Sequence, residues 1–221
     1  MAMGATTPEL RLAQLRREYT RAGLGEQDLA PDPLVQFQRW FADAESAGIV
    51  EPNAMVLATS DKSGRPSSRL VLLKQFDPRG FVFFTNYSSR KGRELAENPH
   101  ASLTFPWHAL ERQVCVTGTI GKVSREEAEA YFKLRPRGSR LGANVSRQSE
   151  VVPSREVLER RLAELERQHP GDDIPMPAEW GGYVLAPDEI EFWQGRPNRL
   201  HDRLRYRRKA GVDWVVERLS P

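Results

Sequence analysis

The fold is decided by residues 54–87, "AMVLATSDKSGRPSSRLVLLKQFDPRGFVFFTNY". Three apolar runs, at 54–60, 67–76 and 81–87, are separated by "DKSGRP" and "DPRG". Asp, Pro and Gly are typical turn residues, and short β-branched or aromatic runs bounded by them are typical of antiparallel strands. The stretch therefore predicts a β-meander, with "DPRG" as the turn of a hairpin.

Similar short runs continue toward the C-terminus. We predict further strands at 101–107, 112–124, 183–187, 189–195, 198–208 and 213–219. Because strands outnumber strand–helix–strand units, the predicted fold class is mainly β with flanking helices (α+β), built as a closed or half-closed antiparallel barrel. Residues 1–8 are expected to be a disordered tail, and residues 9–221 a single domain.

Helix signals lie between these runs. Asp32 and Pro33 are a capping residue and a first-turn proline, and Ser124 with Glu127 forms a capping box. The predicted helices are Leu10–Tyr19, one from Asp32 to Gly48 with Leu34, Phe37, Phe41 and Ala44 on one face, one from Ser124 ended by Pro136, and one at Ser154–Gln168 that carries Leu158, Leu162 and Leu165 toward the core.

The composition is that of a globular protein without a membrane span. The chain has 221 residues, of which 39% are hydrophobic and 29% charged. The apolar runs are too short to cross a bilayer, and the N-terminus lacks the apolar segment of a signal peptide, so we expect a cytoplasmic protein. One cysteine excludes an internal disulfide, and the absence of Cys/His spacing motifs leaves no predicted metal site. A net charge of +3 does not by itself demand nucleic-acid binding.

Four groups of polar side chains point to bound anions. Ser88 or Ser89 is a natural N-cap, which places Arg90 and Lys91 in the first turn of a short helix. Cations there oppose the helix dipole, so the placement favours a phosphate at that end; the alternative is a solvated basic turn.

The second group is "RLVLLK", in which strand alternation puts Arg69 and Lys74 on opposite faces, the alternative being charges at the sheet margin. The third is "YFKLRPRGS". Tyr131 and Arg135 share a helix face and Ser139 follows, a set suited to a phosphate monoester unless it is an ordinary surface helix end.

The segment "NRLHDRLRY" gathers cations in a predicted strand. Alternation puts Arg199, His201, Arg203 and Arg205 on one face. The pattern favours an anionic ligand, with Trp193 nearby, or else an edge strand whose charges prevent aggregation. Asp202 falls on the opposite face, with no evident counter-ion in the sequence.

In their order along the chain, several motifs resemble the pyridoxine/pyridoxamine 5′-phosphate oxidase family. They are "RLVLLK", "FFTNYSSRKGREL", "FPWHALERQVCVTG", "YFKLRPRGS", "SRQSE", "WGGY", "IEFWQG", "RLHDR" and the terminal "RLSP", and they extend from about Arg16 to Pro221. The resemblance implies an FMN-binding split barrel that works as a homodimer with FMN at the subunit interface, and neither nucleic acid nor membrane as a partner.

The resemblance also implies site residues. Those expected to bind FMN are Arg69, Leu70, Val71, Leu72, Leu73, Lys74, Phe84, Thr85, Arg90, Lys91, Gln113, Gln148, Ser149, Trp193 and Arg203. Those expected to bind substrate are Lys74, Tyr131, Arg135, Ser139, Arg199, Leu200 and His201, with Arg16, Arg17, Glu18 and Tyr19 in a segment that covers the site. Phe84 stands where the family commonly has tyrosine, and Glu51 where some members have aspartate.

The implied reaction is FMN-dependent oxidation of pyridoxine or pyridoxamine 5′-phosphate to pyridoxal 5′-phosphate. Oxygen is the electron acceptor, hydrogen peroxide a by-product, and Arg199 and His201 the catalytic residues that hold the substrate ring. One alternative is a related FMN oxidase of another pathway, of the phenazine type, which does not require the substrate clamp. A basic module that binds nucleic acid through Arg199–Lys209 is the alternative from another class, and it predicts a colourless protein.

Overall fold

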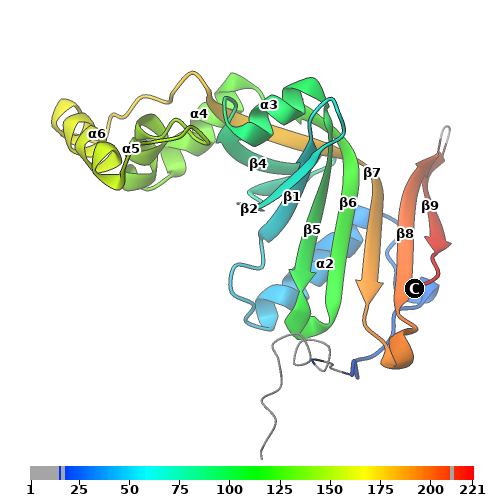
Figure 1. Ribbon diagram of the computed structural model, residues 1–221. Helices are drawn as coiled ribbons and strands as arrows, with labels where there is room; N and C mark the ends of the chain where they lie inside the picture. Colours follow the sequence, from blue (N-terminus) through cyan, green and yellow to red (C-terminus); the bar gives the residue numbers. More distant parts are fainter. Residues whose placement is uncertain (1–14, 16–17, 210–211) are drawn as a thin grey trace, which may run out of the picture.

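The computed structural model describes residue 15, residues 18–209 and residues 212–221. In these residues the fold is built on one antiparallel sheet of nine strands (Figure 1). Their order is β2-β1-β5-β6-β7-β4-β3, with β8 beside β7 and β9 beside β8. The strands are β1 Ala54–Ser60, β2 Pro66–Leu72, β3 Gln75–Asp77, β4 Gly80–Asn86, β5 His100–Trp107, β6 Arg112–Lys122, β7 Trp180–Gln194, β8 Asp202–Lys209 and β9 Val212–Arg218.

Strand β7 has two different partners along one edge. Its first part pairs with β4, from Trp180 to Leu185, and its last part pairs with β8, from Glu189 to Gln194. Pro187 lies between the two parts, where its missing N–H does not break a ladder on that edge. On the other edge, β6 changes register between Thr117 and Gly118. The sheet therefore divides along β7 and curls into a half-open barrel.

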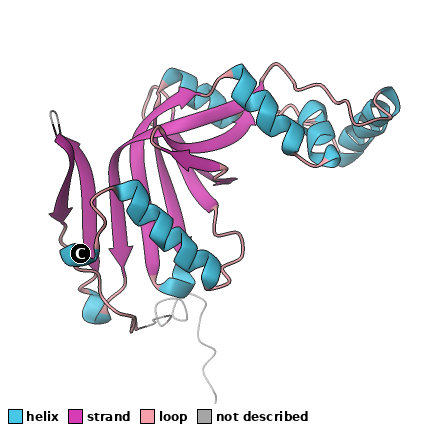
Figure 2. Cartoon of the chain, turned by 180° about the vertical axis from the view of Figure 1, so that it is seen from behind, coloured by secondary structure: helices cyan, strands magenta, loops and turns pink. Residues whose placement is uncertain are grey.

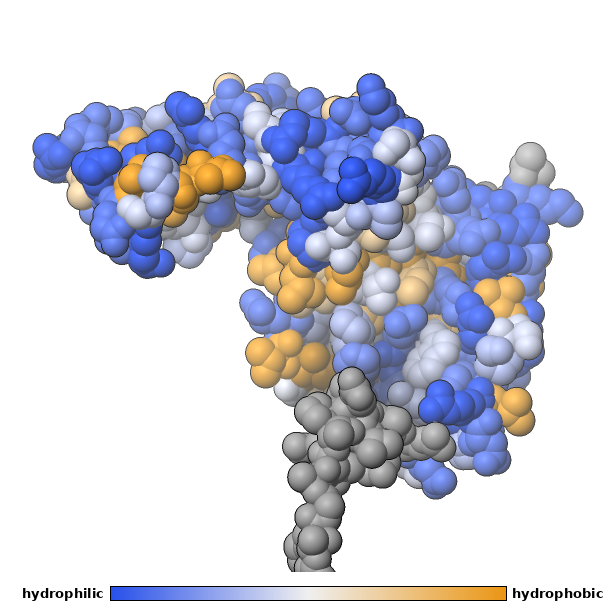
Figure 3. Space-filling view, in the orientation of Figure 1, coloured by the Kyte–Doolittle hydropathy of each residue, from blue (hydrophilic) through white to orange (hydrophobic). Residues whose placement is uncertain are grey.

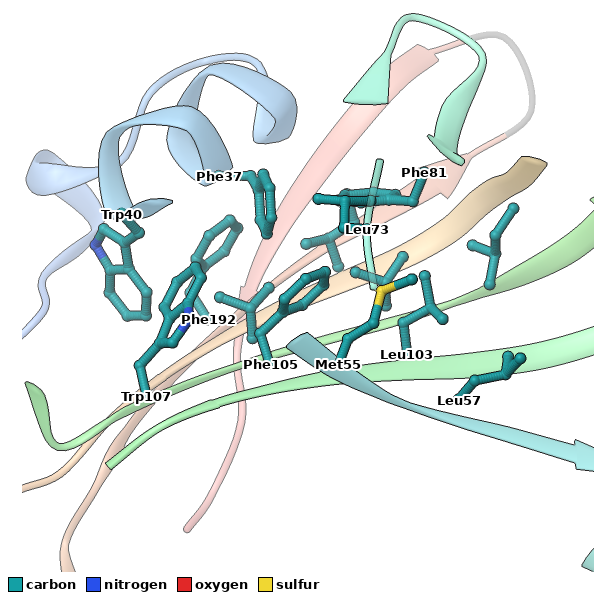
Figure 4. Close-up of a cluster of buried hydrophobic side chains, with 14 of the residues drawn as sticks. Phe37, Trp40, Met55, Leu57, Leu73, Phe81, Leu103, Phe105, Trp107 and Phe192 are labelled. Carbon is teal, nitrogen blue, oxygen red and sulfur yellow. The ribbon is translucent and has the colours of Figure 1, made fainter. Parts of the chain in front are cut away.

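The main core lies between the curled sheet and α2, Pro33–Ser46 (Figure 2). Asp32 caps this helix by accepting the backbone N–H of Leu34 at 2.6 Å, as predicted. Figure 4 shows Phe37 of α2 among aromatic side chains of the strands. Its ring centroid lies 5.0 Å from those of Phe81 and Phe105, and its exposed fraction is 0%.

A second cluster fixes the first helix of an arm formed by α4, Arg125–Leu134, α5, Arg137–Val145, and α6, Arg155–Gln168. It consists of Val82, Val123, Ala128, Phe132 and Trp180. The arm extends to one side of the barrel (Figure 1). The remaining helices near the site are α3, Arg90–Glu97, and the one-turn helix Pro197–Arg199.

Several sequence predictions need correction. The run 67–76 forms two strands, β2 and β3, while 183–187 and 189–195 form one, β7, because its proline sits at the partner change. Helix α5 was not predicted. Leu158, Leu162 and Leu165 do not reach the core, since no residue of α6 is buried and the helix contacts α5 instead. The apolar periodicity of a helix indicates that one of its faces is covered, but it does not identify the element that covers it.

The N-terminal predictions are largely outside the described residues. This holds for the tail at 1–8 and for most of the helix predicted at 10–19, whose described members 15, 18 and 19 are not helical. Within the part of the chain that the structure describes, no helix has the length and apolar character to cross a membrane. The single domain at 9–221 stays a prediction.

Phe37→Ala tests the core. Removing a ring that contacts helix and strands should lower the free energy of unfolding by roughly 3–5 kcal/mol. The measurement is urea unfolding at fixed protein and cofactor concentration, because ligands shift apparent stability. Phe41→Ala, at a half-buried position of the same helix, is the control and should cost less; equal losses would contradict this description of the core.

Candidate active site

A cavity of about 780 Å³ lies between β2, β4, β7 and the helices α3 to α5. Twelve predicted site residues line it: Arg69, Leu70, Val71, Leu72, Lys74, Phe84, Thr85, Lys91, Tyr131, Arg135, Ser139 and Gln148. It brings together segments that are up to 111 positions apart, between Arg69 and Trp180. Sequence reasoning missed other lining residues, namely Asn86, Leu134, Pro136, Gly142, Ala143, Ser146 and Trp180; all but Gly142 and Ala143 lie within the quoted motifs "FFTNYSSRKGREL", "YFKLRPRGS", "SRQSE" and "WGGY".

The cavity is strongly cationic. Arg69, Lys74, Lys91 and Arg135 line it, and its described lining residues include no carboxylate. Arg69 and Lys74 were expected on opposite faces of one strand. That expectation is wrong because β2 ends at Leu72, so Lys74 lies beyond the alternating part and both cations line the same cavity. Leu73, in contrast, belongs to the core.

Helix α3 starts at the cavity. Ser89 caps it by accepting the backbone N–H of Gly92, as one of the two predicted caps. The Lys91 side chain is buried, and its Nζ donates to Gln148 Oε1 at 2.7 Å and Thr85 Oγ1 at 3.1 Å. Burial, and then the charge of Arg69, lower the pKa of Lys91 to about 8. A buried ammonium group held only by neutral oxygens is suited to an anion.

The other predicted cation of this turn behaves differently. Arg90 does not line the cavity, because its guanidinium group turns to Glu94 at 2.8 Å. Its backbone N–H instead donates to Ser149 Oγ at 3.1 Å. Ser149 thus joins the segment after α5 to the helix start, next to Gln148, although its side chain does not line the cavity.

The four cations that line the cavity form its cationic wall, and Glu94 is a buried carboxylate behind this wall. It accepts hydrogen bonds from Thr59 and Ser67 and pairs with Arg69 at 3.4 Å and Arg90 at 2.8 Å. Burial alone would raise the pKa of Glu94, but hydrogen bonds from Ser67, Thr59 and Arg90 lower it to about 2. Glu94 therefore ties β1, β2 and α3 together and fixes the direction of Arg69.

An aromatic stack forms another wall. The Phe84 ring lies 4.1 Å from that of Tyr131 and 5.5 Å from that of Trp180, both nearly parallel to it. Phe84 thus contributes packing where a tyrosine hydroxyl would add a polar contact. The Arg135 guanidinium lies 4.9 Å from the Trp180 ring, and its buried Nη1 has no hydrogen-bond partner among the described residues. A buried donor of this kind calls for an acceptor from outside the chain.

The remaining described site residues form a second group, at the other end of β7. Gln113, Trp193 and Arg203 are direct neighbours across β6, β7 and β8, all half-buried on the outer face of the sheet. Tyr19 and His201 pack on Trp193, with ring centroids at 5.7 and 4.6 Å. Glu18 is exposed next to Tyr19, while Arg16 and Arg17 lie outside the described residues.

The strand predicted at 198–208 begins only at Asp202, so Arg199 and His201 do not alternate with Arg203. Asn198 and Arg199 have φ of 57° and 61°, a left-handed pair incompatible with a strand. Arg199 and Leu200 are exposed. The loop is fixed by Asp202, which accepts the Leu24 N–H at 2.9 Å and pairs with Arg218 at 2.7 Å and with Arg196 at 3.5 Å. Asp202 therefore has the counter-ions that the sequence did not identify.

The positive charge of the group around Trp193 is already partly neutralised within the chain. Arg203 binds both carboxylate oxygens of Glu191, at 2.8 and 3.0 Å. The Nδ1 atom of His201 accepts the Arg196 N–H at 3.1 Å. Burial, and then the charge of Arg199, lower the pKa of His201. The neutral ring then carries its proton on Nε2, which can donate to a ligand.

The two groups are far apart in one chain. Trp180 begins β7 at the cavity and Trp193 lies near its end. At about 3.3 Å per residue, the strand separates them by roughly 40 Å along its length.

Comparisons with known proteins agree with this arrangement. The family model described as pyridoxamine 5′-phosphate oxidase matches residues 41–169, and that described as pyridoxine 5′-phosphate oxidase C-terminal dimerisation region matches residues 180–221. The pyridoxine/pyridoxamine 5′-phosphate oxidase of Rubrobacter xylanophilus is 62% identical over 210 residues, covering 95% of this chain and 96% of that protein. That of Salinispora arenicola is 57% identical over 220 residues, covering 99% and 98%.

Solved structures show the same fold. PhzG from Burkholderia lata, solved with tetrahydrophenazine-1-carboxylic acid, has a TM-score of 0.84 and 36% identity, covering 90% of this chain and 98% of that one. An FMN-binding protein of Nostoc punctiforme related to pyridoxamine 5′-phosphate oxidase has a TM-score of 0.66 at 19% identity, covering 87% and 98%.

The fold and the cationic cavity define an FMN-binding split-barrel flavoprotein, a homodimer through its C-terminal region. Within that class, the chain belongs to the pyridoxine/pyridoxamine 5′-phosphate oxidase family of oxidoreductases. The residues present fit FMN, because the cavity offers cations without carboxylates among its described lining residues, a buried lysine held by neutral oxygens and an aromatic wall.

Glu94→Gln tests the support of the cationic wall. Because the folded-state pKa of about 2 lies below the ordinary value of 4.5, the charged carboxylate stabilises the fold above about pH 4.5, and this contribution is lost as the pH falls toward 2. We expect the variant to be less stable at pH 7 by roughly 2–4 kcal/mol, with a smaller difference at pH 3. Urea titrations at both pH values measure this. Glu97→Gln, exposed on the same helix, should have little effect; a pH-independent loss in Glu94→Gln would contradict the expectation.

Proposed function

We propose that the protein oxidises pyridoxine 5′-phosphate and pyridoxamine 5′-phosphate to pyridoxal 5′-phosphate with oxygen as the electron acceptor. The alcohol and oxygen give the aldehyde and hydrogen peroxide; the amine, oxygen and water give the aldehyde, ammonia and hydrogen peroxide. The observation that carries the proposal is the cavity in which Tyr131, Arg135 and Ser139 converge with Lys74, in a chain of this family. We also expect the enzyme to be cytoplasmic.

Two anionic groups need two sets of donors, and the cavity has them. Lys91 at the start of α3 and Thr85 near the end of β4, with Gln148 and Ser149 beside them, supply donors for the phosphate of FMN. The junction of α4 and α5 supplies Tyr131, Arg135 and Ser139 for the substrate phosphate, where Arg135 Nη1 lacks a partner among the described residues. When bound, FMN supplies the two-electron redox chemistry.

Arg199 and His201 orient the substrate ring. In the neutral form of His201, Nδ1 is occupied by the Arg196 N–H and Nε2 is a donor, suited to a ring substituent. Arg199 is exposed and adds positive charge above the ring. Trp193 and Tyr19 pack around His201 and limit the access of water.

We infer that each site is shared between two subunits. The cavity and the group around Trp193 lie roughly 40 Å apart along β7, so one chain does not bring both to one flavin. The C-terminal region, which matches a dimerisation region, carries Trp193, His201 and Arg203. Apolar surface is visible on the arm and on the barrel face beneath it (Figure 3) and is suited to a second subunit. Leu70 of β2 and Leu134 of α4 are 69% and 82% exposed and are suited to the same contact.

Mixed dimers test the shared site. Arg135→Ala and His201→Ala should each lose most activity as homodimers. After subunit exchange we expect about a quarter of the wild-type activity, because about half of the dimers are mixed and each holds one intact site. Activity after mixing, against each variant alone, is the measurement. No recovery, with exchange verified by mass spectrometry of differently tagged subunits, would place each site within one chain.

The phenazine-type alternative has one observation in its favour, the 36% identical PhzG structure. It does not require a phosphate clamp, so Tyr131, Arg135 and Ser139 in one cavity favour the phosphorylated substrates.

The deciding experiment is an assay of the yellow holoprotein with both phosphorylated substrates, following pyridoxal 5′-phosphate by absorbance and peroxide by a coupled reaction. We expect turnover of at least one substrate with equal amounts of both products. We further expect kcat/KM to fall about 100-fold or more in Arg199→Ala and in His201→Ala. A yellow protein that turns over neither substrate would refute the proposal.

A further inference from the structure

Arg140 is a buried arginine directly after Ser139 on α5, and it is not among the described residues that line the cavity. Only 7% of the residue is exposed. Its Nη1 donates to the carbonyl of Asp172 at 2.8 Å and its Nη2 to Asp172 Oδ1 at 2.7 Å. Nε is buried without a partner among the described residues. Burying a cation costs free energy, so its retention here indicates that its contacts have a structural role.

Those contacts hold α5 through the segment 169–178, which joins α6 to β7 and is neither helix nor strand. Side chains of the arm donate hydrogen bonds to the backbone carbonyl groups of this segment. Arg137 donates to His169 and Gly171, Asn144 to Pro175 at 3.0 Å, and Arg125 of α4 to Met176 and Pro177. Of these α5 side chains, only Arg140 is buried.

Helix α5 has less support from the hydrophobic clusters than α4. Its buried residues are Arg140 and Leu141, the partly buried Ala143 packs against the second cluster, and its principal contacts are with α6, which itself buries no residue. In contrast, α4 is fixed by Phe132 and Ala128 in the second cluster. The position of Ser139 relative to Tyr131 and Arg135 therefore depends on how the segment 169–178 holds α5, and Arg140 is the central tie.

We propose that Arg140 is a positioning residue that sets the enzyme's selectivity for phosphorylated over unphosphorylated substrates. By fixing α5, it holds Ser139 at the distance from Arg135 that a phosphate monoester spans. This rests on the proposed function of the cavity. Because both terminal nitrogens of Arg140 are engaged by Asp172, the effect is exerted through α5 and not by contact with the ligand.

The test compares Arg140→Met with the wild type as FMN-loaded, full-length dimers. For pyridoxamine 5′-phosphate, KM should rise about 10- to 100-fold while kcat changes less than about threefold, since a displaced clamp weakens binding and leaves the redox centre intact. The dissociation constant of pyridoxal 5′-phosphate should rise similarly, and that of unphosphorylated pyridoxal should not change. Arg140→Lys, which keeps one donor, should recover part of the loss.

Arg155→Met is the matched control, an arginine of α6 whose side chain is 84% exposed and pairs with Glu159. It should leave all values unchanged. An unchanged affinity for pyridoxal 5′-phosphate in Arg140→Met would overturn the proposal, and so would equal losses for pyridoxal and pyridoxal 5′-phosphate. If Arg140→Met does not fold, the same criteria applied to Arg140→Lys decide. Absence of turnover in the wild type would refute the proposed function instead, while the binding measurements would still decide the role of Arg140.

Discussion

The change of partner along β7 is the constraint on which the structure depends. One strand pairs with β4 up to Leu185 and with β8 from Glu189, so two parts of the one sheet share a single strand. Pro187 marks the division, and Gly118 opposite allows close approach, because a Cβ there would lie 2.0 Å from the carbonyl oxygen of Ala186. The cavity forms where the first part of β7 meets β4, and the group around Trp193 forms beyond the division.

Much of this arrangement follows from local sequence rules. The strand 54–60 and the caps at Asp32, Ser89 and Ser124 depend on neighbours within a few residues, and the structure confirms them. The convergence of Tyr131, Arg135 and Ser139 was also predictable, since a helix ended by proline leaves few directions for the next residues.

The remaining errors have a common physical cause, since each concerns contacts distant in sequence. In the sequence, the spacing of Arg199 and Arg203 fits strand alternation, but the left-handed conformation of residues 198 and 199 interrupts the strand. The contacts of Asp202 with Leu24 and Arg218 fix the loop in this conformation. Trp180 was not named as a site residue because its neighbours in the stack, Phe84 and Tyr131, are about 50 to 100 positions away. The family resemblance supplied ligand identities that strand and helix patterns do not contain.

The cationic cavity also makes cofactor binding part of the folding equilibrium. Four like charges lie around one space without a carboxylate among its described lining residues, so the empty protein carries a repulsion that an anion removes. A ligand that binds only the folded state adds stability that grows with the logarithm of its concentration. The melting temperature of this protein should therefore act as a gauge of flavin occupancy, and a chain weakened elsewhere in the fold should regain stability when the flavin supply is increased.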